Sequence, residues 1–138
     1  MAEVTLTDVT KKFGETVAVR DFSVTVADGE FVTFLGPSGC GKTTTLRLIA
    51  GFLSPTAGRV TIGERVVTDV ERGIFVPPEQ RGVGMVFQSY AVWPHMTVFN
   101  NVAYPLKIKK LPKAEIRRRV GEALALVKMA ELADRYPH

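Results

Sequence analysis

The stretch Gly36-Pro37-Ser38-Gly39-Cys40-Gly41-Lys42-Thr43-Thr44 decides how this sequence of 138 residues is interpreted. It contains the pattern G-x-x-x-x-G-K-[ST], which is typical of a loop that binds phosphate groups. The apolar run of residues 31–35 precedes it and predicts a β-strand buried on both faces. A helical pattern that stops at Gly51 follows it. Strand, loop and helix therefore come in the order that the motif requires.

Each residue type in this loop has a physical role in holding an anion. Glycine permits backbone angles that a side chain would forbid, so successive N–H groups can point into one concavity. The N-terminus of the following helix adds a partial positive charge. Lys42 is expected to reach the β- and γ-phosphates, and the Thr43 hydroxyl to ligate Mg²⁺. The expected phosphate-contacting residues are Gly36, Pro37, Ser38, Gly39, Cys40, Gly41, Lys42, Thr43 and Thr44.

The alternative interpretation of this loop is a glycine-rich turn with a solvated lysine. The flanking strand and helix patterns disfavour that alternative, because they supply the context on which the motif depends. Within the loop, Cys40 is most simply a small filler residue.

The composition is that of a small globular domain. Apolar residues make up 46% of the chain and charged residues 23%, so a core is expected and disorder is not. Cys40 is the only cysteine, which excludes an intramolecular disulfide and fits a reducing, cytosolic compartment. The N-terminus lacks a signal-peptide pattern, and no run approaches the roughly 18 apolar residues of a membrane span. Any membrane-spanning part would therefore come from a partner.

The remainder of the first two thirds of the chain alternates between strand and loop patterns. A period-2 pattern that ends at Val26 predicts a half-buried strand, and the turn signal Asp28-Gly29 follows it. A second alternation ends at Ile62. Residues 70–80 are predicted to be a loop, and the apolar run of residues 83–87 predicts another strand.

The last third is helical in pattern. Thr97 is a good N-cap for a helix, and Pro105 is expected to end or kink that helix. A second helix is predicted to start near Pro112, a residue that suits a first-turn position. The apolar residues at helical spacing in this second helix are Ile116, Val120, Ala123, Leu124 and Val127.

Several motifs outside the phosphate loop agree with those of one family. Ile49-Ala50-Gly51 and Pro55-Thr56-Ala57-Gly58 follow the loop, and Val83-Gly84-Met85-Val86-Phe87-Gln88-Ser89-Tyr90 comes later, followed by Trp93-Pro94-His95-Met96-Thr97-Val98. In order and spacing these motifs resemble those of the ATP-binding cassette (ABC) transporter ATPases. The resemblance extends from about Val4 to the end of the chain, and the nearest likeness is to ATPase subunits of bacterial importers for sugars, polyamines or ferric iron. It implies that the bound nucleotide is ATP with Mg²⁺.

The resemblance implies roles for three further residues. Phe13 matches the aromatic residue of the A-loop, which stacks on adenine, although tyrosine is commoner there; the alternative is a core phenylalanine beside a turn. Val19 matches a small apolar residue under the adenine. Gln88 matches the Q-loop glutamine, which would contact Mg²⁺ or the attacking water and act with Lys42 in catalysis; the alternative is a polar residue that ends a strand.

The resemblance also implies partners and a location. Residues 89–101 would touch a transmembrane permease subunit, with Trp93 and Met96 as exposed contact residues. The alternative for these two side chains is packing into the start of the helical subdomain. In the complete protein, a second ATPase subunit would bind head to tail, at the cytoplasmic face of a bacterial or archaeal membrane.

The family pattern is not complete within this sequence. The LSGGQ signature, the Walker B strand and the switch histidine do not occur, and Asp69, Glu71 and Asp134 do not follow apolar strand patterns. Family membership implies an ATPase that drives transport. The chain by itself is expected to bind ATP, but to show no appreciable turnover and weak or absent ATP-dependent dimerisation, because turnover needs a carboxylate and a positioned water.

The predicted fold class is α/β: a P-loop NTPase core with an N-terminal antiparallel β-subdomain and the start of a helical subdomain, without the C-terminal part of the sheet. Residues 1–96 would form the nucleotide-binding core, and residues 97–138 part of the helical subdomain. A truncated or split gene product is compatible with this prediction.

A rival interpretation is a regulatory or nucleic-acid-linked P-loop protein that uses the basic stretch of residues 107–119. Ile116 and Val120 recur at helical spacing within this stretch, which favours the solvated face of an amphipathic helix. The sequence has no nucleic-acid-binding motif, so we expect no nucleic-acid partner.

Overall fold

The computed structural model describes residues 2–89 and 91–138. These residues form two compact units, the first extending to Val86 and the second comprising Phe87–His138. The division predicted from motif roles falls after residue 96 and assigns residues 87–96 to the core. The contacts place the residues from Phe87 onward in the second unit.

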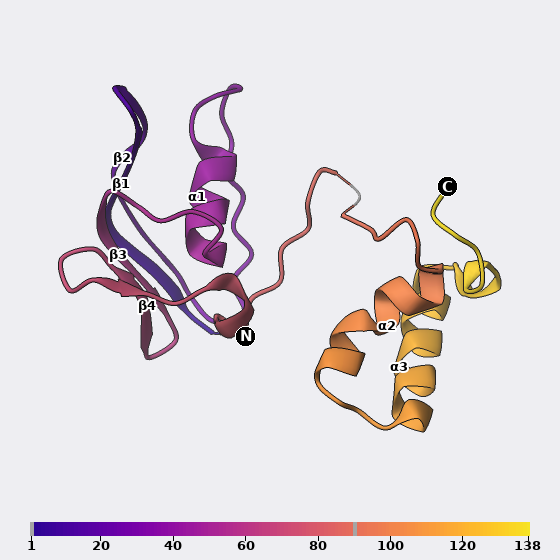
Figure 1. Cartoon of the computed structure of the whole chain (residues 1–138). Helices are drawn as coiled ribbons and strands as arrows, with labels where there is room; N and C mark the ends of the chain where they lie inside the picture. Colours follow the sequence, from indigo (N-terminus) through magenta and orange to yellow (C-terminus); the bar gives the residue numbers. More distant parts are fainter. Residues whose placement is uncertain (1, 90) are drawn as a thin grey trace. The chain divides into compact units, whose positions relative to one another are not determined.

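The first unit contains a five-stranded antiparallel sheet in the order β2-β1-β3-β4-β5 (Figure 1). In the centre of the sheet, Leu6 lies opposite Val24 on one side and Val60 on the other. The strands are β1 (Val4–Phe13), β2 (Thr16–Val26), β3 (Ala57–Ile62), β4 (Arg65–Asp69) and β5 (Ile74–Phe75). The predicted strands ending at Val26 and Ile62, and the β-subdomain as a whole, are confirmed.

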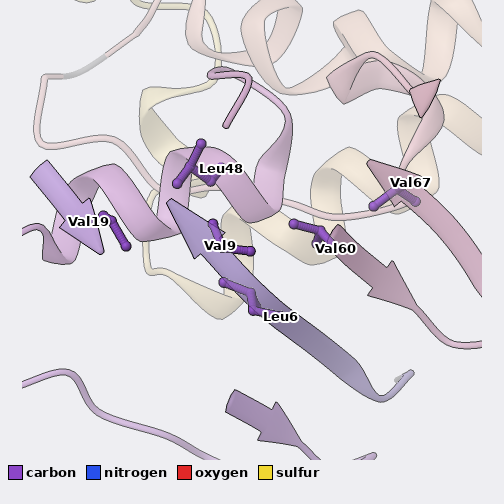
Figure 2. Packing of buried hydrophobic residues seen from close by; sticks show 6 residues of the cluster. All are labelled: Leu6, Val9, Val19, Leu48, Val60 and Val67. Atoms are coloured by element: carbon purple, nitrogen blue, oxygen red, sulfur yellow. The ribbon is translucent and has the colours of Figure 1, made fainter. Parts of the chain in front are cut away.

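Helix α1 (Lys42–Ala50) packs against this sheet and closes the core of the first unit. Figure 2 shows Leu48 of α1 near Val9 and Leu6 of β1, and both Leu48 and Val9 are 0% exposed. The other buried members of the cluster are Val19, Val60 and Val67. The helix ends at Gly51, whose φ of 83° is left-handed and whose N–H bonds back to Leu48, so the predicted stop is confirmed.

Two strand predictions are wrong. Residues 31–35 and 83–87 are irregular, and Phe31, Leu35 and Val86 are 92%, 89% and 98% exposed. A strand buried on both faces needs hydrogen-bonded neighbours and a covering layer on each face. Among the described residues, every strand pair belongs to the antiparallel sheet, and none of its strands flanks these two segments. The predicted turn at Asp28-Gly29 is confirmed.

The segment predicted as a loop, residues 70–80, contains more structure than expected. It includes β5 and a short 3-10 helix, η1 (Pro78–Gln80). Asp69 ends strand β4, although the sequence pattern gave it no strand.

The second unit contains α2 (Val98–Ile108), α3 (Lys113–Leu126) and a 3-10 helix, η2 (Ala130–Leu132). Thr97 is the predicted N-cap of α2, and its hydroxyl accepts a hydrogen bond from the Asn100 N–H. The helix continues through Pro105 to Ile108, so it does not end at the proline, and the alternative that Pro105 kinks it stays a prediction. Pro105 removes one backbone bond, while Leu106 packs on the unit's core and keeps the last turn in place.

The core of the second unit lies between α2 and α3. Its buried residues are Ala103, Ile116, Val120 and Leu124. Helix α3 starts near Pro112 as predicted, with Pro112 as its N-cap rather than its first residue. Val127 is 58% exposed, so the buried face of α3 is narrower than predicted. None of the helices in the described part of the chain has the length and apolar character to cross a membrane.

Candidate functional site

The phosphate loop turns sharply into α1 because of its glycines. Gly39 and Gly41 have φ angles of 83° and 93°, in the left-handed region that favours glycine. A Cβ at Gly41 would lie 2.5 Å from the Ala18 carbonyl oxygen in β2, so only glycine lets the helix start this close to the strand. A Cβ at Gly36 would meet the Cys40 sulfur at 2.7 Å, so the loop also closes on itself.

Lys42 is the first residue of α1, and its side chain folds back into the loop. The Nζ atom donates to the carbonyl oxygens of Gly36 and Pro37, both at 2.7 Å, and lies 3.5 Å from the Cys40 sulfur. These contacts hold the ammonium group inside the loop rather than in open solvent. The alternative of a solvated lysine on a simple turn does not fit this geometry.

The first turn of α1 borders a hollow of about 120 Å³. It is lined by Gly39, Gly41, Lys42, Thr43 and Thr44. Thr43 is exposed, whereas Thr45 is buried and donates to the Gly41 carbonyl at 3.0 Å, so Thr45 is structural. Since a water occupies about 30 Å³ in the liquid, the hollow has room for a multi-atom polar group. Loop, lysine and helix N-terminus together suit an anion.

A larger hollow of about 300 Å³ also borders the loop residues. Val19 contributes to it and is 8% exposed, with its Cγ2 atom 3.3 Å from a Cβ placed on Gly41. The predicted place of Val19 under adenine stays a prediction. The hollow is lined by Ala18, Val19, Arg20, Phe22, Phe34, Leu35, Cys40, Gly41, Lys42 and Thr45.

Phe13 lies at the end of β1, just before the turn at Gly14, and is 47% exposed. The Lys11 ammonium lies 5.0 Å from the centre of its ring. The alternative of a core phenylalanine is therefore wrong. The ring is accessible for stacking, and its contact with adenine stays a prediction.

Gln88 is exposed and belongs to the second unit. The structure therefore places it in a different unit from Lys42 and Thr43, and its role as γ-phosphate sensor and Mg²⁺ ligand stays a prediction. Among the described residues, no cluster of three or more His, Cys, Asp or Glu could hold a metal ion. Mg²⁺ in such a site would use the Thr43 hydroxyl and nucleotide phosphates, a ligand set that Mg²⁺ often takes.

The segment predicted to touch a permease is partly packed within the second unit. Trp93 is 40% exposed, and the centre of its ring lies 4.3 Å from the centre of the Tyr104 ring in α2. Met96 is half-buried. Both interpretations of these side chains thus keep some support, and the permease contact stays a prediction. Tyr90, also in this segment, lies outside the described residues.

Sequence reasoning missed Arg81, whose guanidinium is buried in the first unit with the residue 5% exposed. All five of its N–H groups donate hydrogen bonds, as many as a guanidinium has. Burial lowers the pKa of Arg81 from its ordinary value. Its acceptors are the carbonyls of Val76, Leu48, Ile49 and Val67 and the Thr68 hydroxyl.

Asp69 is a structural carboxylate in this unit. Its oxygens accept hydrogen bonds from Arg59 Nε at 2.9 Å and from the Arg72 N–H at 3.1 Å. Burial alone would raise the pKa of Asp69, but these bonds and the two arginine charges outweigh burial, so the pKa is lowered. The carboxylate is therefore ionised and paired.

The basic stretch of residues 107–119 is partly explained by α3. Ile116 and Val120 are buried, and the Arg118 guanidinium bonds to Glu115 at 2.7 Å and to Glu122 at 2.8 Å. Hydrogen bonds from Arg118 and Arg119 lower the pKa of Glu115 to about 2. For residues 113–119, the interpretation as the solvated face of an amphipathic helix is confirmed, whereas residues 107–112 form the end of α2 and the connection to α3.

Comparison with known proteins agrees with these features. The sequence profile of the family described as ABC transporter matches residues 19–138. The chain is 57% identical over 137 residues to the trehalose/maltose import ATP-binding protein MalK of Thermococcus litoralis, covering 99% of this chain and 37% of the relative. It is 53% identical over 138 residues to the spermidine/putrescine import ATP-binding protein PotA of Acidothermus cellulolyticus, covering 97% and 34%. The chain thus spans about a third of these relatives.

A solved structure supports the fold. The dimeric post-hydrolysis state of the ATP-binding cassette MJ0796, bound to ADP and Pi, matches with a TM-score of 0.81 and 33% identity. The match covers 97% of this chain and 61% of that chain. The predicted fold class is confirmed by this likeness.

Proposed function

The chain belongs to the ABC transporter family, and on this premise we propose that the loop from Gly36 to Thr44 binds the phosphates of MgATP. The observation that carries the proposal is the position of the Lys42 ammonium inside the loop, 2.7 Å from two loop carbonyls and at the N-terminus of α1. On binding, phosphate oxygens would replace these carbonyls as acceptors. A bond from the ammonium to an anionic phosphate oxygen is stronger than the bond to a neutral carbonyl that it replaces.

The remaining contacts to the nucleotide follow from the family resemblance. The Thr43 hydroxyl would ligate Mg²⁺, the Phe13 ring would stack on adenine, and Val19 would lie under the base. Gln88 would contact Mg²⁺ or the attacking water. The exposed ring of Phe13 and the exposed Thr43 support these roles.

The test is a binding titration of a fluorescent ATP analogue with and without Mg²⁺. We expect Lys42→Ala to weaken binding at least tenfold, because one charge-assisted contact to phosphate contributes about 1.5–3 kcal/mol. Lys113→Ala in α3 is the matched control and should bind like the wild type. Equal affinity of Lys42→Ala and wild type, in folded proteins, would refute the proposal.

At the level of the complete protein, we propose an importer ATPase that couples MgATP binding and hydrolysis to transport. The names of the relatives MalK and PotA support an importer. Permease subunits would contact residues 89–101, and a second ATPase subunit would bind head to tail, at the cytoplasmic face of the membrane. The two relatives import different solutes, so the transported solute is expected to depend on the partner subunits.

For this chain by itself, we propose ATP binding without appreciable turnover. The motivation is that Asp69, which ends β4, is engaged by Arg59 and Arg72 rather than available to a metal or water. The measurement is steady-state phosphate release. Release that Lys42→Ala abolishes would overturn this proposal and leave the binding proposal standing.

A further inference from the structure

Arg81 joins three separate parts of the first unit. Its Nη1 atom donates to the carbonyl oxygens of Leu48 and Ile49, both at 3.0 Å, in the last turn of α1. Its Nη2 atom donates to the Thr68 hydroxyl at 2.8 Å in β4, and its Nε atom to the Val76 carbonyl at 2.7 Å. The guanidinium therefore fixes the C-terminal end of α1 to the sheet.

No other common side chain could make the hydrogen bonds that Arg81 makes. Carbonyls at the end of a helix have no partners within the helix, and a cation there is favoured by the helix dipole. Only a planar guanidinium has enough donors to reach all of these acceptors at once. Gly51 is part of the same arrangement, since a Cβ there would overlap with the Arg81 side chain.

The charge on Arg81 has no carboxylate partner within the described part of the chain. The hydrogen bonds of the Arg81 guanidinium go to four carbonyl oxygens and one hydroxyl, all of them neutral. The centre of the Phe75 ring lies 5.1 Å from the guanidinium carbon. A buried cation without an anion is costly to fold around, and in this unit five hydrogen bonds to fixed acceptors offset that cost.

The other end of α1 carries the phosphate loop. The helix has nine residues and is about 13 Å long, so a change at its C-terminal end can be passed on to its N-terminus. At its N-terminus Gly41 lies against β2, and in its last turn the Leu48 side chain is fully buried. A shift of this last turn would tilt the helix and displace the N–H groups and Lys42 at the other end.

We propose that Arg81 is a positioning residue for the phosphate loop: by fixing the C-terminal end of α1, it holds Lys42 and Thr43 in the geometry that binds phosphate. The inference rests on the proposed function of the loop. It predicts that nucleotide affinity depends on a guanidinium that does not touch the nucleotide.

The test measures MgATP-analogue affinity of the folded 138-residue protein and its variants. Arg81→Ala and Arg81→Lys should bind at least tenfold more weakly than wild type. Methylguanidinium should restore the affinity of Arg81→Ala to within about threefold and should leave wild type and Arg81→Lys unchanged. By linkage, MgATP should raise the affinity of Arg81→Ala for methylguanidinium by the same factor.

A matched control separates positioning from general loss of stability. Val60→Ala removes buried volume in β3 and leaves the acceptors of the Arg81 hydrogen bonds in place. The folded variant should therefore bind the MgATP analogue with wild-type affinity, and methylguanidinium should not change that affinity. Thr68→Val removes a single acceptor and should weaken binding two- to threefold even if the Arg81 variants do not fold.

The outcomes separate the two proposals. If wild type does not bind MgATP, the proposed function fails. If wild type binds, and the folded Arg81→Lys and Thr68→Val proteins bind equally well, the positioning role of Arg81 is wrong while the phosphate site stands. Weakened binding that methylguanidinium does not restore in folded Arg81→Ala also overturns it.

Discussion

The segment before the phosphate loop and the helix after it differ in how they are held. Residues 31–35 form no strand, and Phe31 and Leu35 are 92% and 89% exposed. Helix α1, in contrast, has Leu48 fully buried in the core and its last turn bonded to Arg81. The loop is therefore fixed mainly from its helix side, because an apolar segment is buried only where another element packs against it.

The largest expected difference in the free energy of unfolding is between substitutions of two leucines, Leu48 and Leu35. Leu48→Ala in α1 should lower the free energy of unfolding by about 2–5 kcal/mol, because it leaves a cavity in the core. Leu35→Ala, the same chemical change before the loop, should alter it by no more than about 0.5 kcal/mol. Urea denaturation followed by circular dichroism measures both. Equal losses for the two variants would show that the segment before the loop is packed in solution, contrary to the comparison.

Local signals explain which parts of the fold could be predicted. The helix after the loop, its stop at Gly51 and the N-cap at Thr97 depend on residues within one or two turns, and each was identified from sequence. The strands predicted at residues 31–35 and 83–87 do not form, since a strand depends on partners elsewhere in the chain. An apolar sequence indicates that a segment tends to be buried, but it does not show which strand would pair with it.

In the candidate site, too, the residues of a local motif could be predicted and a residue with distant partners could not. Gly36, Gly41 and Lys42 carry a compact motif, and the structure brings them together around one loop. Arg81 could not be found, because its bonds to Leu48 and Ile49 span more than thirty residues, separations of 33 and 32. A lone arginine before a glycine has no pattern that distinguishes a buried cation from a surface one.

Two glycines of the phosphate loop, Gly39 and Gly41, test how tightly the helix side of the loop is held. Gly39 and Gly41 both have left-handed φ angles, so alanine is strained at either position. Only a Cβ at Gly41 meets backbone, the Ala18 oxygen at 2.5 Å, while a Cβ at Gly39 has nothing within 4 Å. Gly41→Ala should therefore cost about 1–3 kcal/mol more than Gly39→Ala.

The same denaturation assay measures this difference, and nucleotide binding supplies a second readout. Gly41→Ala should also lose affinity for MgATP, because the start of α1 would have to move away from β2. If the two alanine variants are equally stable, the loop does not lie tightly against the strand, and the helix side is less fixed than the comparison states.

The smallest expected effect on stability concerns a ring contact between the segment before the loop and β2. Phe34 is half-buried and its ring meets that of Phe22 in β2 edge to face, with centroids 6.0 Å apart. Phe34→Leu should lose this aromatic contact and about 0.5–1.5 kcal/mol of stability. Phe31→Leu, at a residue that is 92% exposed, is the control and should change nothing measurable. A loss confined to Phe34→Leu would mean that the segment has a fixed point two residues before Gly36, so that the loop is held weakly from this side as well. No loss in either variant would mean that α1 and its contacts alone set the position of the loop.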